Sequence, residues 1–192
     1  MDKLLTILLF YLISNSVFGQ DKAIDWYYEH TNSEVLLQTS FPKGGPYPGP
    51  TTEHYNHSYL VFFSRMENIS QKPVRFQLEF SAQEIAIPNA PEARMKVFLP
   101  SETMTPEKVS QFSYGITTLD LLQQTTQFQK TLQPGEDCYF YLVAFFYQTH
   151  PNPLNEYRGG NRAAILLDGQ DLVFTMEPQV ASSVCGQWAF KE

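Results

Sequence analysis

The amino-acid sequence predicts an all-β fold, an antiparallel two-sheet β-sandwich with eight or nine strands and one or two short helical turns. Apolar residues recur at every second position in several segments, which is the period of a strand with one face in a core. Turn sequences rich in Gly and Pro separate these segments. Of the 192 residues, 43% are hydrophobic and 15% aromatic, which suffices for the core of one domain.

The first 19 residues have the order of a signal peptide. Lys3 precedes an apolar run at residues 4–13, and a short polar stretch then ends at the small residue Gly19. The run has about half of the ~20 residues that a membrane-spanning helix needs. We therefore expect cleavage before Gln20, no membrane span in the mature chain, and a secreted or periplasmic protein. A buried N-terminal strand or helix is the alternative.

Residues 20–192 are expected to form a single domain with a Pro/Gly-rich loop at residues 41–56. The segment 41–52 reads FPKGGPYPGPTT, with four Pro and three Gly. Proline lacks a backbone N–H and glycine weakens regular structure, so this composition disfavours both a helix and a sheet interior. The sequence therefore predicts a long extended loop here.

The strands themselves are predicted from two kinds of pattern. Residues 74–80 alternate strictly between apolar and polar side chains, and residues 95–99 repeat the alternation. Residues 59–66 and 138–147 are apolar at nearly every position, as expected for strands covered on both faces. These two are predicted to be the central strands.

Three chain reversals are expected between the strands. Gln-Pro-Gly-Glu at residues 133–136 suits a type II turn, which predicts that residues 127–132 pair with 137–147. Asp168-Gly169 predicts a hairpin that joins residues 163–167 to 171–176. Residues 68–73 form the third reversal.

Helix signals are confined to two short stretches, residues 105–112, which begin with an N-cap Thr and a Pro, and residues 120–124. The reversal that begins Asn68-Ile69-Ser70, together with the turn sequence at 132–136, resembles that of immunoglobulin-like accessory modules of exported bacterial proteins. This resemblance implies an immunoglobulin-like type of sandwich. It implies no function, because such sandwiches host many functions.

Charge and motifs exclude several classes of function. The chain has 13 Lys and Arg against 20 Asp and Glu, a formal net charge of −7, so it should not attract nucleic acid. It contains no Gly-rich phosphate loop and no Gly-x-Ser-x-Gly elbow. We expect no cofactor, and no residue stands out as catalytic.

If the protein is an enzyme, its histidines are the main candidates for the catalytic site. His54 and His57 are three residues apart, and His150 follows a predicted central strand. An exported hydrolase with a loop-built site around these three residues is the alternative function. No Cys or carboxylate lies at a spacing that completes a zinc signature, so we interpret His54 and His57 as solvated loop residues and predict no metal site.

The two cysteines, Cys138 and Cys185, both lie in predicted strands. In an exported protein two such residues commonly pair, and we expect a disulfide bond between them. The alternative is two buried thiols that never approach each other.

Aromatic and amide side chains gather in two predicted loops. Their flat rings and directional polar tips suit sugar faces or peptide edges, although the rings could instead pack over the second face of a central strand. The predicted ligand-binding residues are Tyr47, Tyr55, Asn152, Asn155, Tyr157 and Arg158.

These features together predict an exported, non-enzymatic binding or envelope-assembly module whose partner is a glycan or a cell-envelope protein. In an assembly, four side chains of one central strand would face a partner's sheet. These four are Tyr139, Tyr141, Phe145 and Tyr147.

Overall fold

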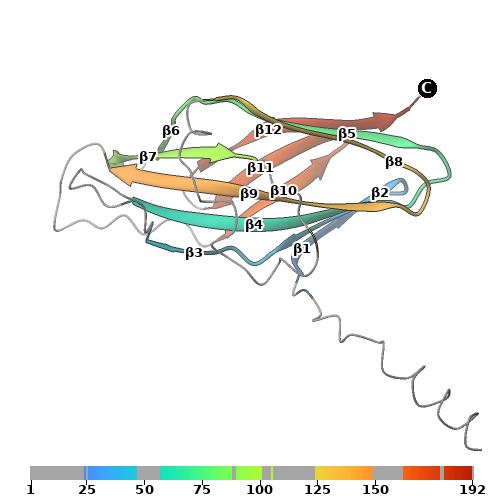
Figure 1. Ribbon diagram of the computed structural model, residues 1–192, viewed down its shortest axis with the longest axis horizontal. Helices are drawn as coiled ribbons and strands as arrows, with labels where there is room; N and C mark the ends of the chain where they lie inside the picture. Colours follow the sequence, from blue (N-terminus) through green and yellow to red (C-terminus); the bar gives the residue numbers. More distant parts are fainter. Residues whose placement is uncertain are drawn as a thin grey trace, which may run out of the picture.

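A computed structural model gives the structure of the chain for residues 24, 26–46, 57–87, 90–100, 105, 124–148, 162–177 and 180–191. These residues form strands and turns, with two antiparallel sheets of seven and five strands packed as a β-sandwich (Figure 1). The predicted all-β sandwich of two antiparallel sheets is confirmed, and its immunoglobulin-like type stays a prediction. The predicted signal peptide lies outside the described residues, as do the two predicted helical turns except for residues 105 and 124. The described residues contain no helix long and apolar enough to cross a membrane.

Twelve strands are described, more than the eight or nine predicted. The larger sheet has the order β1-β2-β4-β9-β7-β6, and β3 also pairs with β4. The smaller sheet has the order β10-β11-β12-β5-β8. The strands are β1 (Trp26–Thr31), β2 (Val35–Ser40), β3 (Lys43–Pro46), β4 (His57–Asn68), β5 (Val74–Phe80), β6 (Ile85–Ile87), β7 (Ala90–Phe98), β8 (Thr126–Leu132), β9 (Asp137–Gln148), β10 (Arg162–Asp168), β11 (Asp171–Glu177) and β12 (Val180–Phe190).

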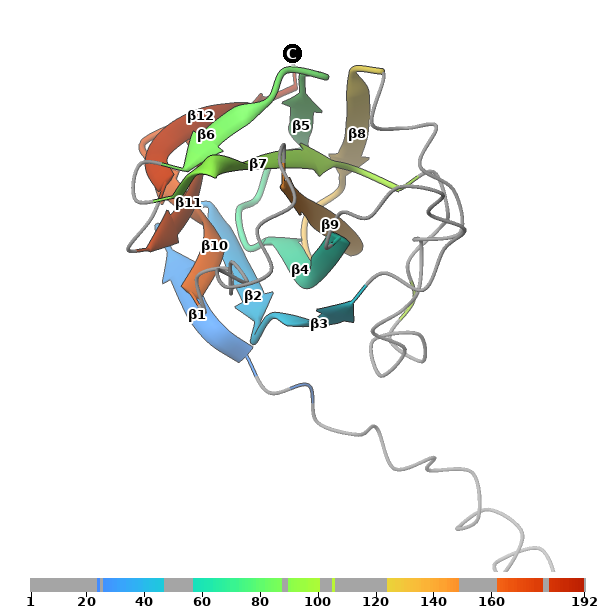
Figure 2. The same cartoon turned by 90° about the vertical axis from the view of Figure 1, so that its left-hand side faces the viewer.

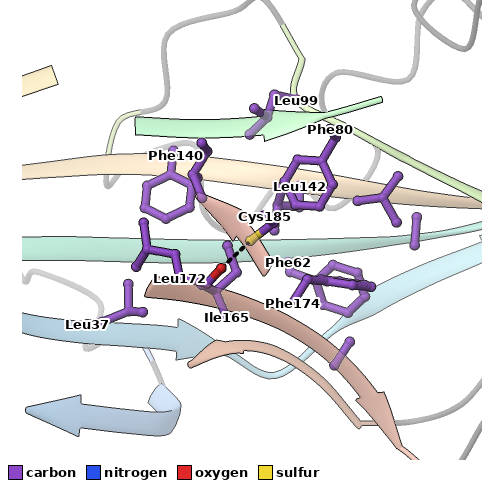
Figure 3. Close-up of a cluster of buried hydrophobic side chains, with 14 of the residues drawn as sticks. Leu37, Phe62, Phe80, Leu99, Phe140, Leu142, Ile165, Leu172, Phe174 and Cys185 are labelled. Atoms are coloured by element: carbon purple, nitrogen blue, oxygen red, sulfur yellow. Dashed lines mark hydrogen bonds between the residues drawn. The ribbon is translucent and has the colours of Figure 1, made fainter. Parts of the chain in front are cut away.

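The main core fills the space between the two sheets, which Figure 2 shows end-on. Strand β5 alternates strictly, so Val74, Phe76 and Leu78 are fully buried while the residues between them are exposed. Figure 3 shows side chains of both sheets meeting in this core, among them Phe62 of β4 and Phe174 of β11. The alternation read from the sequence is confirmed here.

A second hydrophobic cluster lies on the other face of the seven-stranded sheet. It comes from the central strands β4 and β9 and from β7, and its members are at most 5% exposed. Ile24, which precedes β1, packs against it. The prediction that the two central strands are covered on both faces is therefore confirmed. The cluster consists of Tyr59, Val61, Phe63, Phe98, Tyr141, Val143 and Phe145.

The turn at residues 133–136 forms as predicted, but the pairing expected around it is wrong. Gly135 has a φ of 77°, and the N–H of Glu136 donates to the carbonyl of Gln133 over 2.9 Å. Strand β8 nevertheless pairs with β5, and β9 pairs with β4 and β7. The turn carries the chain from one sheet to the other, because β9, with 12 residues, pairs with the equally long, apolar β4, whereas β8 has only 7 residues.

The predicted loop at residues 41–56 is also corrected in part, since its residues Lys43–Pro46 form β3. Strand β3 lies along β4 at the end that β2 does not reach. Proline is tolerated there because an edge strand pairs on one side only. A Cβ on Gly44 would overlap the carbonyl oxygen of Tyr59, so this close pairing requires glycine. Residues 47–56 lie outside the described residues.

The second predicted hairpin is confirmed. Strands β10 and β11 pair along their whole length, from Asp168 opposite Asp171 to Arg162 opposite Glu177. Gly169 has a φ of 60° at the first position of the tight turn, a conformation that other residues adopt only with strain.

The predicted disulfide between Cys138 and Cys185 is absent from the structure, in which both are free, buried thiols. They lie in different sheets, on β9 and β12. Cys138 follows the turn at residues 133–136, and this turn begins after Leu132, the partner of Val74 on β5. Cys185 precedes Gly186, the partner of Leu78 on β5. Four residues along β5 correspond to about 13 Å, too far for a disulfide. The Cys185 thiol donates instead to the carbonyl of Leu172 over 3.2 Å (Figure 3).

Candidate functional site

One end of the seven-stranded sheet brings together the bases of the two segments that the sequence singled out. His57 begins β4, Tyr147 is the penultimate residue of β9, and the two lie opposite each other. Arg94 of β7 lies opposite Tyr147 on its other side. The segments 47–56 and 149–161 therefore start from neighbouring strands at the same end. We call this region the loop end and define it by His57, Glu84, Arg94, Phe145 and Tyr147.

Aromatic rings form the base of the loop end. Side chains two residues apart on a strand share a face, which places Phe145 and Tyr147 together. The ring of His57 stacks on Phe145 with centroids 5.4 Å apart and lies 6.4 Å from Tyr147. Phe145 is 2% exposed, while His57 and Tyr147 are half-buried. The ring of Phe145 is thus the buried member of this group, and His57 and Tyr147 are partly exposed beside it.

A polar group borders these rings. The hydroxyl of Tyr147 donates a hydrogen bond to Oε1 of Glu84, and Oε2 of Glu84 lies 3.9 Å from Nε of Arg94. The side chains of Arg94 and Glu84 remain 30% and 47% exposed. Burial, followed by the bond to Glu84, raises the pKa of Tyr147 above its ordinary value. The phenol therefore keeps its proton at neutral pH and acts as the donor.

The polar and aromatic groups of the loop end have the chemistry of a recognition site. A guanidinium, a carboxylate and a phenol offer directional hydrogen bonds next to apolar rings. Within the described part of the chain, no group of three or more His, Cys, Asp or Glu could hold a metal ion. His57 stacks on Phe145 and is half-buried, so the interpretation of this residue as a solvated loop histidine is wrong.

The other residues predicted from sequence lie outside the described residues. These are Tyr47, Tyr55, His54, His150, Asn152, Asn155, Tyr157 and Arg158. The structure describes the strand ends from which their segments leave, and these strand ends are neighbours.

Two of the described site residues escaped the sequence reasoning. Glu84 is 63 residues from Tyr147 along the chain, and it precedes a strand of three residues that was not predicted. Arg94 precedes the alternating segment at residues 95–99 and was not singled out. The pattern of one strand indicates which face a side chain lies on but does not identify its neighbours in the sheet.

The four aromatic residues expected to face an assembly partner do share the outer face of the seven-stranded sheet. Tyr141 and Phe145 are 2% exposed, so they are already buried within this chain. Direct contact with a partner's sheet would require these side chains to be uncovered first.

Comparisons with protein-family models, with curated proteins and with solved structures give no match for this chain.

Proposed function

We propose that the protein is an exported, non-enzymatic binding domain that recognises a protein of the cell envelope through the loop end. Export is supported by the order of the first 19 residues. Binding at this end is supported above all by one observation, the pairing of His57 with Tyr147 across β4 and β9. Because of this pairing, the segments 47–56 and 149–161 adjoin neighbouring strands at the same end of the sheet.

The chemistry of the region favours a protein partner over a glycan. Tyr and Arg carry much of the binding energy in protein interfaces, and Tyr and Asn are frequent in loops that bind proteins. A sugar platform needs an exposed ring face, whereas Phe145 is buried. The described base instead offers the partly exposed charges of Arg94 and Glu84. No described contact favours the hydrolase alternative.

Site-specific photo-crosslinking of the exported full-length protein in its own cells tests this proposal. A photoreactive amino acid replaces Tyr47 in one variant and Tyr157 in a second. The matched control places it at Gln133, an exposed turn position at the other end of β9. We expect one discrete protein adduct from both loop positions and none from the control position.

Absence of an adduct from both loop positions would overturn the proposal. Adducts of equal yield from all three positions would also contradict it, because they would indicate random collision.

A further inference from the structure

Five strands of the sandwich have an edge that no described strand pairs with, namely β1, β3, β6, β8 and β10. A long, free edge is the part of a sheet to which another chain can add a strand, and short strands, proline or a covering element prevent this. Strand β1 of the larger sheet and β10 of the smaller sheet lie side by side (Figure 2). Strand β3 has four residues and ends at Pro46, and β6 has three residues. Four of the five edges are therefore covered or short.

Strand β8 is the exception, since it has seven residues and pairs with β5 alone among the described strands. All of β8 lies opposite β5, from Thr126 opposite Phe80 to Leu132 opposite Val74. Figure 2 shows β8 at the rim of the smaller sheet, beyond β5. Its outer edge is therefore where a second chain could extend the sheet.

Lys130 breaks the burial pattern of β8 on the side that faces the core. Residues opposite each other in a sheet share a face, and Lys130 lies opposite Phe76, which is fully buried. Its neighbours on this face are Phe128, which packs against the core, and Leu132, which is fully buried. Lys130 itself is exposed. Its side chain therefore belongs to the core face but still reaches solvent.

The charge of Lys130 acts on the other sheet. Burial raises the pKa of Cys138 on β9, and the positive charge of Lys130 lowers it. The ammonium group is thus on the side of β8 that faces β9. Lys130 forms no ion pair with another residue that the structure describes. Strand β8 itself has the sequence TQFQKTL, which contains no carboxylate.

Pairing of β8 with β8 of a second copy would bury this charge without a counter-ion. In every register that continues one core face, Lys130 lies opposite a core-face residue of the other copy. That residue is Thr126, Phe128, Leu132 or the second Lys130, and none of these is acidic. Enclosing an ammonium group among apolar side chains is strongly unfavourable, and two ammonium groups that face each other repel.

We infer that Lys130 keeps the chain from associating with a second copy of itself through β8. Among the described strands, β8 has the long edge that neither a covering strand nor a proline protects, and an inward-facing lysine protects it instead. The inference is independent of the proposed function, because the loop end belongs to the seven-stranded sheet.

Removing the charge tests this inference. Lys130→Val, and the smaller change Lys130→Thr, should make the exported protein associate at least about 100-fold more tightly than the wild type, because an unpaired charge no longer has to be buried. Sedimentation velocity over a concentration series measures the association. Lys130→Arg keeps the charge and should stay monomeric like the wild type.

Two matched controls separate the position of this lysine from the loss of any charge. Lys43→Val removes an exposed lysine from the short edge strand β3. Gln129→Val makes the preceding residue of β8, on the outer face, apolar. Both should stay monomeric. Hydrogen exchange then locates the contact, since the amides of residues 127–131 should gain protection only in Lys130→Val and Lys130→Thr. Melting curves establish that each variant is folded.

Three results would overturn the inference. They are a wild-type protein that already associates with residues 127–131 protected, Lys130→Val and Lys130→Thr variants that stay monomeric at every concentration, and association of these variants without new protection in β8. Equal association of Lys43→Val would also contradict it, because net charge would then keep the chains apart.

Discussion

Asn68 connects the two sheets through its side chain. The residue is fully buried at the end of β4, and its amide group donates to the carbonyls of Lys72 over 2.8 Å and of Leu132 over 3.0 Å. Its Oδ1 accepts from the N–H and the hydroxyl of Ser70. The residue therefore fixes two of the connections between the sheets, β4 to β5 and β8 to β9. Asn68-Ile69-Ser70 matches the Asn-x-Ser glycosylation sequon. A glycan on Asn68 is incompatible with the fold, because the amide nitrogen is buried and already bonded.

Replacing Asn68 should destabilise the protein strongly. Asn68→Ala removes a donor from the carbonyls of Lys72 and Leu132 and the acceptor of the Ser70 N–H. We expect a loss of about 2–3 kcal/mol in the free energy of unfolding. Asn68→Asp keeps the shape but points carboxylate oxygens at two carbonyls, so it should cost at least as much. Urea denaturation measures both. Gln133→Ala, at an exposed position in the adjoining turn, should change stability by less than about 0.5 kcal/mol; a similarly small effect of Asn68→Ala would contradict this account.

A second prediction concerns the two buried thiols, Cys138 and Cys185. Burial raises the pKa of Cys138 and of Cys185 from 9.0 to about 12. Between pH 9 and pH 12 the unfolded state therefore loses these protons while the folded state keeps them. The contribution of the two thiols to the free energy of unfolding is present below pH 9 and is lost as the pH rises toward 12. Neither thiol should react with Ellman's reagent at pH 8 in the native protein.

Unfolding without reductant should release two thiols per chain. No reactive thiol in the unfolded, unreduced protein would show that the disulfide exists after all.

Strand β12 approaches β5 more closely at Gly186 than a side chain allows. A Cβ on Gly186 would overlap the carbonyl oxygen of Gln77 and come within 2.9 Å of Cδ2 of Leu78. Gly186→Ala must therefore shift one strand against the other, and we expect a loss of about 2 kcal/mol or more. Gly135 and Gly169 have open space around them but positive φ, so alanine there should cost only about 1 kcal/mol. Equal losses at all three glycines in urea denaturation would refute the close approach.

The strands that could be predicted are those whose own residues show which faces are buried. Strand β5 follows from its own alternation, and the central position of β4 and β9 follows from apolar side chains on both faces. Strands β1 and β6 were missed because one is half-exposed along its length and the other has three residues. The partner of β8 was predicted wrongly, since a turn sequence fixes a reversal but not the sheet in which the next strand continues.

For the candidate site, the sequence predicted which segments contribute but not which residues meet there. The two segments that the sequence singled out leave from the paired ends of β4 and β9. The partners of Tyr147 were not predictable, because Glu84 and Arg94 reach it across the sheet from a different part of the chain.

The two outer faces of the sandwich differ in character. The face of the seven-stranded sheet is apolar at its centre and buried, with charged groups at both ends: Arg65 bonds to Glu67 and Asp137 at one end, and Arg94 adjoins Glu84 at the other. The face of the five-stranded sheet is polar over β5, where the residues between the buried ones are exposed.

The most direct test of the proposed function is the affinity of the crosslinked partner, once purified, for the mature domain and its variants, measured by isothermal titration calorimetry. Tyr47→Ala and Tyr157→Ala should each weaken binding at least about 30-fold, the loss expected for an aromatic anchor of an interface. The melting temperature should stay unchanged, and Gln77→Ala on the other sheet should bind the partner like the wild type. Unchanged affinity in both Tyr variants, or a loss of affinity only where the melting temperature falls with it, would contradict a binding site at the loop end.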